Sequence, residues 1–147
     1  MKNACKLFGI SLLLIGIAAC TPKAEPIEYG SDLCAFCQMT IVDPQHAAEA
    51  VTQKGRVYKF DAIECMIDYV LQHEQETPFA ILLVADYTRP GKLMDAHAAS
   101  FLISPNIPSP MGAFLSAFSD KEEAQKIKTQ KGGELLNWEQ VKQKRKR

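Results

Sequence analysis

The chain has 147 residues, enough for one ordinary domain or two very small ones. Hydrophobic residues make up 47% of it and charged residues 23%, which is typical of a packed globular protein and excludes a disordered or low-complexity chain. Its 17 basic residues balance 17 acidic ones, so no overall positive charge is present to hold a nucleic acid.

The N-terminus has the pattern of a secretory signal. A short region with two lysines precedes an apolar run over residues 9–19, which ends in small residues and is shorter than the about 20 residues of a transmembrane helix. Residues 17–20, Ile-Ala-Ala-Cys, resemble a bacterial lipobox, in which the cysteine is acylated (for example by palmitate) and becomes the first mature residue. We therefore expect residues 1–19 to be removed and Cys20 to anchor the chain in the cell envelope, facing the periplasm. Thr21 after the cysteine favours the outer membrane.

Charge is unevenly distributed in the mature chain. Without the two signal lysines, 15 basic residues face 17 acidic ones, and five of the basic residues lie in residues 142–147. Residues 20–33 contain two prolines and few apolar side chains, so they predict a lipid-anchored tether. Residues 142–147 predict a solvated basic tail that could also contact anionic lipid headgroups beside the anchor.

Hydrophobic patterns predict the elements of the first half. Asp61 and Glu64 have the spacing of an N-cap and an acidic residue three positions later, and apolar residues at helical spacing continue to about His73. Strands are predicted from alternation over 39–42, 47–53 and 56–60, and from a continuous apolar run over 79–85.

The second half repeats this plan. Ser119 and Glu122 predict a capping box that opens a helix to about Lys131, where Gly132 and Gly133 end it. The predicted fold class is therefore α+β, with two small β-rich units that each place one helix on an antiparallel sheet. The other predicted segments are strands over 99–103, 113–118 and 134–138, a proline-rich loop over 104–110, and a folded domain over 34–141 with possible halves 34–92 and 93–141.

Sulfur-containing side chains are the most informative feature of the mature chain. Three cysteines remain after Cys5 and Cys20, and an odd number in a disulfide-forming compartment indicates a reactive thiol, an intermolecular link or a metal ligand. Cys34-Ala-Phe-Cys37-Gln-Met39 places three sulfurs within six residues. Thiolate and thioether ligands suit Cu(I) better than they suit hard cations. If a strand begins near Cys37, Cys37 and Met39 point to the same face.

Three further residues are weaker candidates. Met111 precedes Gly112 in a loop, Cys65 lies in the first turn of the predicted helix, and His97 precedes a strand. Each has a plain alternative, which is core packing for Met111 and Cys65 and a surface position for His97. The plain alternative for Cys34 and Cys37 is a structural disulfide.

Two other functions fit part of this pattern. A thiol–disulfide oxidoreductase would use Cys34 and Cys37, but such a motif works best at a helix N-terminus, and here the second cysteine leads into a predicted strand. A structural zinc site could combine Cys34, Cys37, Cys65 and His97, the four ligands of a closed tetrahedral site. No nucleophile–base set, phosphate loop or dinucleotide motif is present, so we expect no enzyme.

The order of several short motifs resembles the nitrous oxide reductase accessory lipoprotein family (NosL). After the lipidated Cys20, the resemblance extends over about residues 34–136. The matching segments are Phe36-Cys37-Gln38-Met39, Gly55 to Phe60 before a helix, Val84-Ala85-Asp86-Tyr87, Met94-Asp95-Ala96-x-x-Ala99, Pro110-Met111-Gly112, Ala117-Phe118, and Ala124 to Gly133.

This resemblance implies a Cu(I)-binding lipoprotein of denitrification that loads copper into nitrous oxide reductase. The apo-enzyme and other copper-assembly proteins would be its partners. It also implies a pair of ββαβ units, and a fold like that of organomercurial lyase without its activity. The family's metal ligands fall on Cys37, Met39 and Met111. Cys34 and Cys65 are additions to the family pattern, so they leave open a shared copper site or zinc.

Overall fold

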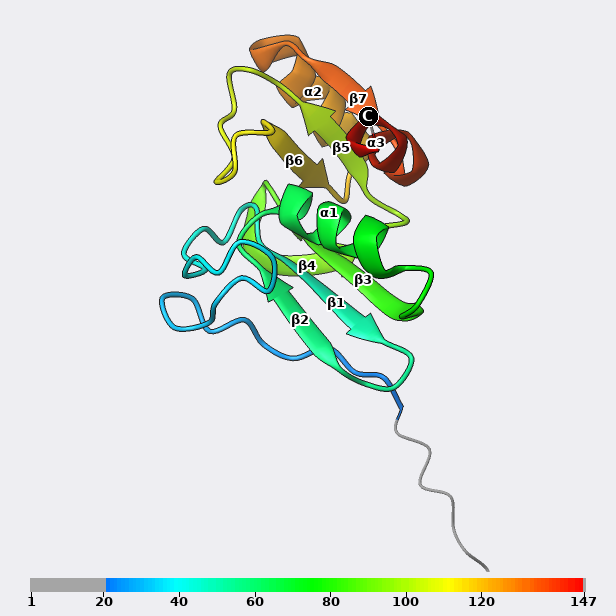
Figure 1. The fold of residues 1–147 in the computed structure, drawn as a ribbon. Coiled ribbons are helices and arrows are strands. Elements are labelled where there is room, and N and C mark those ends of the chain that lie inside the picture. The colour runs from blue at the N-terminus through cyan, green and yellow to red at the C-terminus, as the bar shows by residue number, and fades with distance from the viewer. Residues whose placement is uncertain (1–20, 147) are drawn as a thin grey trace, which may run out of the picture.

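The computed structural model describes residues 21–146, so the predicted signal, Cys20 and Arg147 lie outside the described residues. Figure 1 shows the elements in chain order. They are β1 (Ala48–Thr52), β2 (Val57–Phe60), α1 (Ile63–His73), β3 (Phe79–Asp86), β4 (Arg89–Asp95), β5 (Ser100–Ile103), β6 (Leu115–Phe118), α2 (Lys121–Lys131), β7 (Glu134–Leu136) and α3 (Trp138–Arg145).

Two units share one topology, which confirms the predicted α+β class and the pair of ββαβ units. In the first unit, β1 lies between β2 and β3, and α1 packs on these three strands. In the second unit, β5 lies between β6 and β7, and α2 packs on them. All of these strand pairs are antiparallel. Each unit therefore places its first strand at the centre, with the strands before and after its helix on either side.

The two units form a single sheet in the order β2-β1-β3-β6-β5-β7. They meet where β3 and β6 run parallel, paired at Asp86 and Ala117. β4, which the hydrophobic pattern did not predict, forms a hairpin with β3. Its sequence, Arg-Pro-Gly-Lys-Leu-Met-Asp, has little alternation, so its extended shape comes from pairing with β3. The expected boundary between halves, at 92/93, falls inside this strand.

The buried carboxylate of Asp86 forms hydrogen bonds where the two units meet. Asp86, at the end of β3, is 1% exposed and accepts hydrogen bonds from Ser119 Oγ at 2.7 Å and from the Thr88 hydroxyl at 2.9 Å. The Arg89 guanidinium also donates to it, at 2.7 Å. Burial alone would raise the pKa of Asp86, but these hydrogen bonds outweigh it and lower that pKa to about 2.

We expect Asp86→Asn to lower the free energy of unfolding at pH 7 by up to about 2 kcal/mol, the equivalent of a pKa lowered by roughly two units. Because the folded-state pKa lies below the ordinary value of 3.8, this contribution is complete above about pH 4 and disappears as the pH falls through about 2. Urea unfolding between pH 2 and pH 7 measures it. The two stability curves should converge in acid, and parallel curves would contradict the assignment.

The segment predicted as a tether packs on the sheet instead. The backbone N–H of Glu25 donates to Oε1 of Glu49, a wholly buried residue of β1, at 2.9 Å. Ile27 packs against the core, and Asp32 forms an ion pair with Lys59 of β2 at 2.8 Å. The segment packs on the sheet because the buried Glu49 carboxylate requires a hydrogen-bond donor, which the segment supplies. The free part of any tether is therefore shorter than expected.

Residues 142–145 of the predicted basic tail are also ordered, as the second half of α3. Asn137 and Gln140 cap this helix reciprocally, and Trp138, expected in a strand, begins it. Lys142 pairs with Glu74 at 2.9 Å, and Arg145 pairs with Asp68, so acidic residues on or just after α1 neutralise these two charges. None of the helices within residues 21–146 is long and apolar enough to cross a membrane.

Candidate metal centre

Residues 34–39 form a tight loop and not the start of a strand. The Cys34 carbonyl accepts the Gln38 N–H at 3.0 Å, and the Cys34 N–H donates to the Met39 carbonyl at 2.8 Å. Gln38 has a φ of 66°, in the left-handed region. The predicted strand over 39–42 is wrong: only Leu33 and Thr40 pair there, as an isolated bridge. Strand alternation therefore does not relate Cys37 to Met39.

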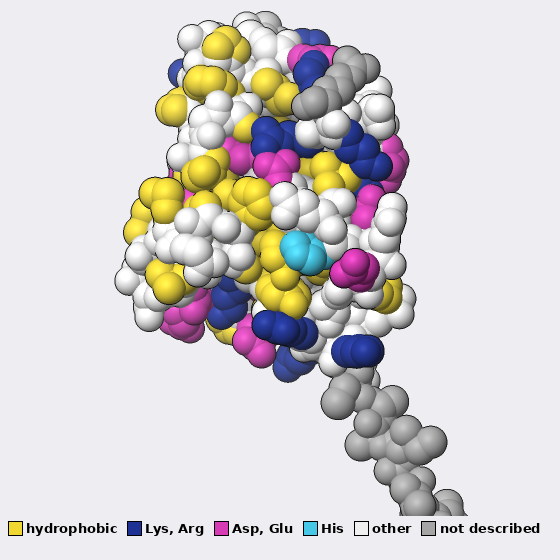
Figure 2. Space-filling model, viewed as in Figure 1, with side chains coloured by type: hydrophobic (Ala, Val, Ile, Leu, Met, Phe, Trp, Pro, Cys, Tyr) yellow, Lys and Arg dark blue, Asp and Glu magenta, His cyan; other side chains and the backbone are white. Residues whose placement is uncertain are grey.

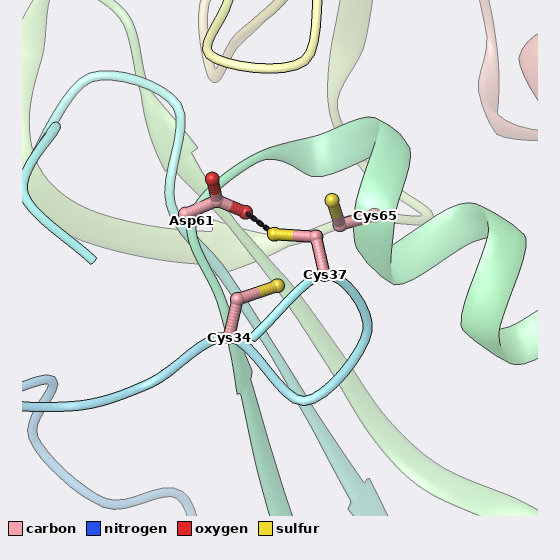
Figure 3. A group of neighbouring side chains, drawn as sticks. All are labelled: Cys34, Cys37, Asp61 and Cys65. Carbon is pink, nitrogen blue, oxygen red and sulfur yellow. Dashed lines mark hydrogen bonds between the residues drawn. The ribbon is translucent and has the colours of Figure 1, made fainter. Parts of the chain in front are cut away.

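Three thiols and one carboxylate converge beside this loop. One ligand atom from each of Cys34, Cys37, Asp61 and Cys65 lies within 4.8 Å of the other three. Figure 3 shows these side chains pointing toward one another from the loop, the end of β2 and the first turn of α1. The N–H of Ala35 donates to the Lys59 carbonyl and holds the loop against β2. The fold thus gathers cysteines that are 31 positions apart in the sequence.

Asp61 is the member of this cluster that the sequence analysis missed. Its spacing to Glu64 predicted an N-cap, but the N-cap of α1 is Ala62, which makes no side-chain hydrogen bond. Asp61 instead accepts a hydrogen bond from the Cys37 thiol, with 3.4 Å between Sγ and Oδ1. Its position between β2 and the helix that carries Cys65 could have indicated that Asp61 lies near Cys65. The capping pattern offered a simpler explanation for the carboxylate.

The three thiols have different acidities. A hydrogen bond from Cys65 lowers the pKa of Cys34 to about 6, while the same interaction and burial raise the pKa of Cys65. Burial also raises the pKa of the partly exposed Cys37 to about 11. Cys34 therefore has the lowest pKa of the three and is the first to become a thiolate, the soft donor that Cu(I) and Zn²⁺ both accept.

These thiols do not combine a low pKa with exposure, as a thiol–disulfide oxidoreductase requires. Such an enzyme needs an accessible thiol with a low pKa. Here the low pKa belongs to Cys34, which is fully buried, and the accessible Cys37 has a raised pKa. Cys37 is also followed by a tight loop and not by a helix.

The two methionine candidates lie on exposed loops. Met39, 54% exposed, is two residues from Cys37. Met111, 43% exposed, lies in a loop that hydrogen-bonds to Glu64, the residue before Cys65. Met39 thus belongs to the loop that carries Cys34 and Cys37, and the Met111 loop is bonded to α1 one residue before Cys65.

His97 lies elsewhere. Its ring packs edge-on against Trp138 of α3, with 5.5 Å between ring centroids. The backbone N–H of His97 donates to the Asp95 carboxylate. It is not a member of the cluster found among residues 21–146. In a four-ligand site built on the three cysteines, Asp61 takes the place that the sequence analysis considered for His97.

The same two loops carry half of the exposed large apolar side chains described. Met39, Met111 and Phe114 belong to this set, and Figure 2 shows hydrophobic side chains gathered on the side where Figure 1 places these loops. Exposed apolar side chains gathered in this way are typical of a surface that contacts another protein. The other exposed members described are Tyr29, Leu33 and Val42.

Comparison with known proteins identifies the family of this chain. A curated relative, the "Copper-binding lipoprotein NosL" of Stutzerimonas stutzeri, is 31% identical, with the match covering 90% of this chain and 77% of the relative. A solved structure, that of the copper chaperone NosL from Shewanella denitrificans, matches with a TM-score of 0.71, covering 80% of this chain and 93% of that chain at 23% identity. At that identity the likeness supports the fold. The sequence model of the NosL family matches residues 27–145. The chain belongs to the NosL family.

Proposed function

We propose that this protein is a lipid-anchored Cu(I) carrier of the cell envelope that supplies copper for the assembly of nitrous oxide reductase. The observation that carries the proposal is the convergence of Cys34, Cys37 and Cys65 within 4.8 Å, with the exposed Met39 two residues from Cys37. Soft sulfur donors of both kinds favour Cu(I) over the harder divalent ions. The curated relative is named as a copper-binding lipoprotein, which supports the same metal here.

The arrangement suits delivery because its ligands differ in exposure. Cys34 and Cys65 are buried, whereas Cys37 is partly accessible and Met39 and Met111 are exposed. A partner can therefore replace the outer ligands first, while the buried thiolates still hold the ion. Copper stays Cu(I) throughout this ligand exchange, so no electron donor or acceptor is required. The exposed apolar side chains of the two loops, Met39, Met111 and Phe114, provide the contact surface for the receiving protein.

The anchor completes the proposal. Cys20 lies outside the described residues, but its lipobox context and the relative's description as a lipoprotein support acylation there. Glu25 is the first residue with a hydrogen bond to the sheet. Five residues of extended chain span about 17 Å, so lipid on Cys20 would keep the domain close to the membrane, in our proposal the periplasmic face of the outer membrane.

Cu(I) competition tests the metal and the ligand set. The protein is residues 21–147, which include every described residue, kept reduced and anaerobic with a colorimetric Cu(I) chelator. We expect one Cu(I) per chain, with affinity lowered about tenfold by Met39→Leu and by Met111→Leu, the scale of changes around a metal site. Leucine keeps side-chain volume but removes the thioether. Met94→Leu, in β4, is the control and should not change affinity. Absence of Cu(I) binding would overturn the proposal.

The same loaded protein tests the partner. Mixed with apo-nitrous oxide reductase, it should lose Cu(I) to that enzyme faster than to an equal concentration of a copper-free control protein. Transfer at the same rate to both would leave a copper-binding lipoprotein without this partner.

A structural zinc site is the second candidate, favoured by one observation. Three thiols and the Asp61 carboxylate make the four protein ligands of a closed tetrahedral site, three of them buried. This alternative predicts that a zinc chelator unfolds the protein and that neither methionine variant changes metal affinity. The carrier proposal predicts the opposite in both measurements.

A further inference from the structure

We infer that Glu64 is a positioning residue that fixes the turn carrying Met111 to α1, the helix that carries Cys65. This inference rests on the proposed function, because it assigns a role toward the Cu(I) ligand Met111. Glu64 was predicted to belong to a helix cap, and its actual contacts are with a loop 45 or more residues away.

One carboxylate oxygen closes the base of the Met111 turn. Oε1 of Glu64 accepts a hydrogen bond from the Ser109 hydroxyl at 2.5 Å and from the Ala113 N–H at 3.4 Å. Ser109 and Ala113 flank Met111 symmetrically, two residues before and two residues after it. The turn itself is closed by the Gly112 N–H, which donates to the Ser109 carbonyl at 3.0 Å. Met111 therefore stands at the tip of a turn whose two ends meet at Glu64.

Other contacts fix the start of this loop, where Ser104 and Asn106 donate to the Lys131 carbonyl and Ile107 is buried, and Glu64 adds the attachment of the Met111 turn. Residues 104–114 contain no regular strand or helix, and Gly112 and Phe114 both have positive φ, at 75° and 58°. A thioether that binds metal must be held in place, since a mobile ligand loses conformational entropy on binding. Glu64 provides this restraint from α1, one residue before Cys65. It thus ties the thioether to the element that carries one of the thiols.

Burying the Glu64 carboxylate does not by itself stabilise the folded protein. Its side chain is 1% exposed, and Oε2 has no hydrogen-bond partner among residues 21–146. A half-satisfied buried carboxylate is costly, and an apolar residue of similar size would fill the same space at lower cost. The carboxylate at this position provides a hydrogen-bond acceptor for Ser109 and Ala113 of the loop.

A double-mutant cycle on residues 21–147 tests the inference. Cu(I) affinity is measured by competition for the unmodified sequence, Glu64→Leu, Met111→Leu and the double variant. We expect Glu64→Leu to weaken binding about as much as Met111→Leu, about tenfold, and the double variant to be no weaker than Met111→Leu alone. Glu64→Gln keeps an acceptor oxygen for both donors, so it should retain the affinity. Additive losses, or loss in Glu64→Gln equal to that in Glu64→Leu, would overturn the inference.

A spectroscopic readout separates positioning from a general loss of structure. With ¹³C-methyl methionine, Cu(I) should shift the Met39 and Met111 methyl resonances of the unmodified protein. In Glu64→Leu only the Met39 resonance should shift. If Glu64→Leu does not fold, Ser109→Ala removes one of the two donors and should show the same coupling to Met111→Leu. If Met111→Leu alone leaves affinity unchanged, Met111 is not a ligand and the inference fails, even though Cu(I) binding by the thiols stands.

Discussion

Replacing Cys37 by serine will weaken Cu(I) binding by more than about 100-fold, because changes around a metal site that leave the ligands intact already cost about 10–100-fold. Serine keeps the size of the side chain but replaces a soft sulfur with a hard oxygen. Cys34→Ser should have at least as large an effect, since Cys34 is a buried member of the cluster and its pKa, lowered to about 6, is the lowest of the three thiols. Chelator competition under anaerobic conditions measures both variants.

His97→Ala is the matched control for these two variants. Its ring packs on Trp138, outside the cysteine cluster, so Cu(I) affinity should be unchanged. A loss of affinity in His97→Ala, together with unchanged affinity in Cys34→Ser, would contradict the site described here. Far-UV circular dichroism of each variant shows that the fold is retained before affinities are compared.

Gly133→Ala should be the most destabilising single substitution in the second unit. A Cβ at this position would lie 2.2 Å from the carbonyl oxygen of Ile103, the last residue of β5, and φ here is 106°. The overlap is with backbone, so no side chain can move aside. We expect a loss of about 3 kcal/mol or more in the free energy of unfolding, from backbone strain and overpacking together. Urea denaturation at neutral pH measures it.

Gly91→Ala separates the two causes. Gly91 has a φ of 80°, and a Cβ there would have nothing within 4 Å. It should therefore lose only the about 1–2 kcal/mol of left-handed backbone strain. Equal losses of unfolding free energy at both positions would contradict the prediction, because they would show that the backbone around Gly133 and Ile103 moves apart at little cost.

The succession of elements was predictable because it depends on local patterns. The apolar run of β3, the alternation of β2 and the helical spacing of α1 each express their period within a few residues. The glycine stop after α2 was found in the same way, although Asp120 and not Ser119 is its N-cap. Cys34 and Cys37 were also identifiable, since their spacing is local.

Elements that depend on distant partners were not predictable. β4 has no alternation of its own and is extended because it pairs with β3. Charges on α3 looked like a solvated tail, because the acids of α1 that neutralise them are about 70 residues away. Glu49 likewise gave no sign that residues 21–33 would fold over it. In each case the stabilising contact is long-range, and sequence proximity carries no information about it.

The candidate site divides along the same line. By itself the sequence determined the two repeated units, the soft-ligand chemistry of Cys37 and Met39 and the family resemblance, because these follow from residue type and short spacing. Only the tertiary structure decided that Cys65 and Asp61 join Cys34 and Cys37, that His97 does not, and that Glu64 holds the Met111 loop. The physical reason is that helix α1 crosses the end of β2 and meets the 34–39 loop. Packing of the core sets that meeting point, and no local pattern encodes it.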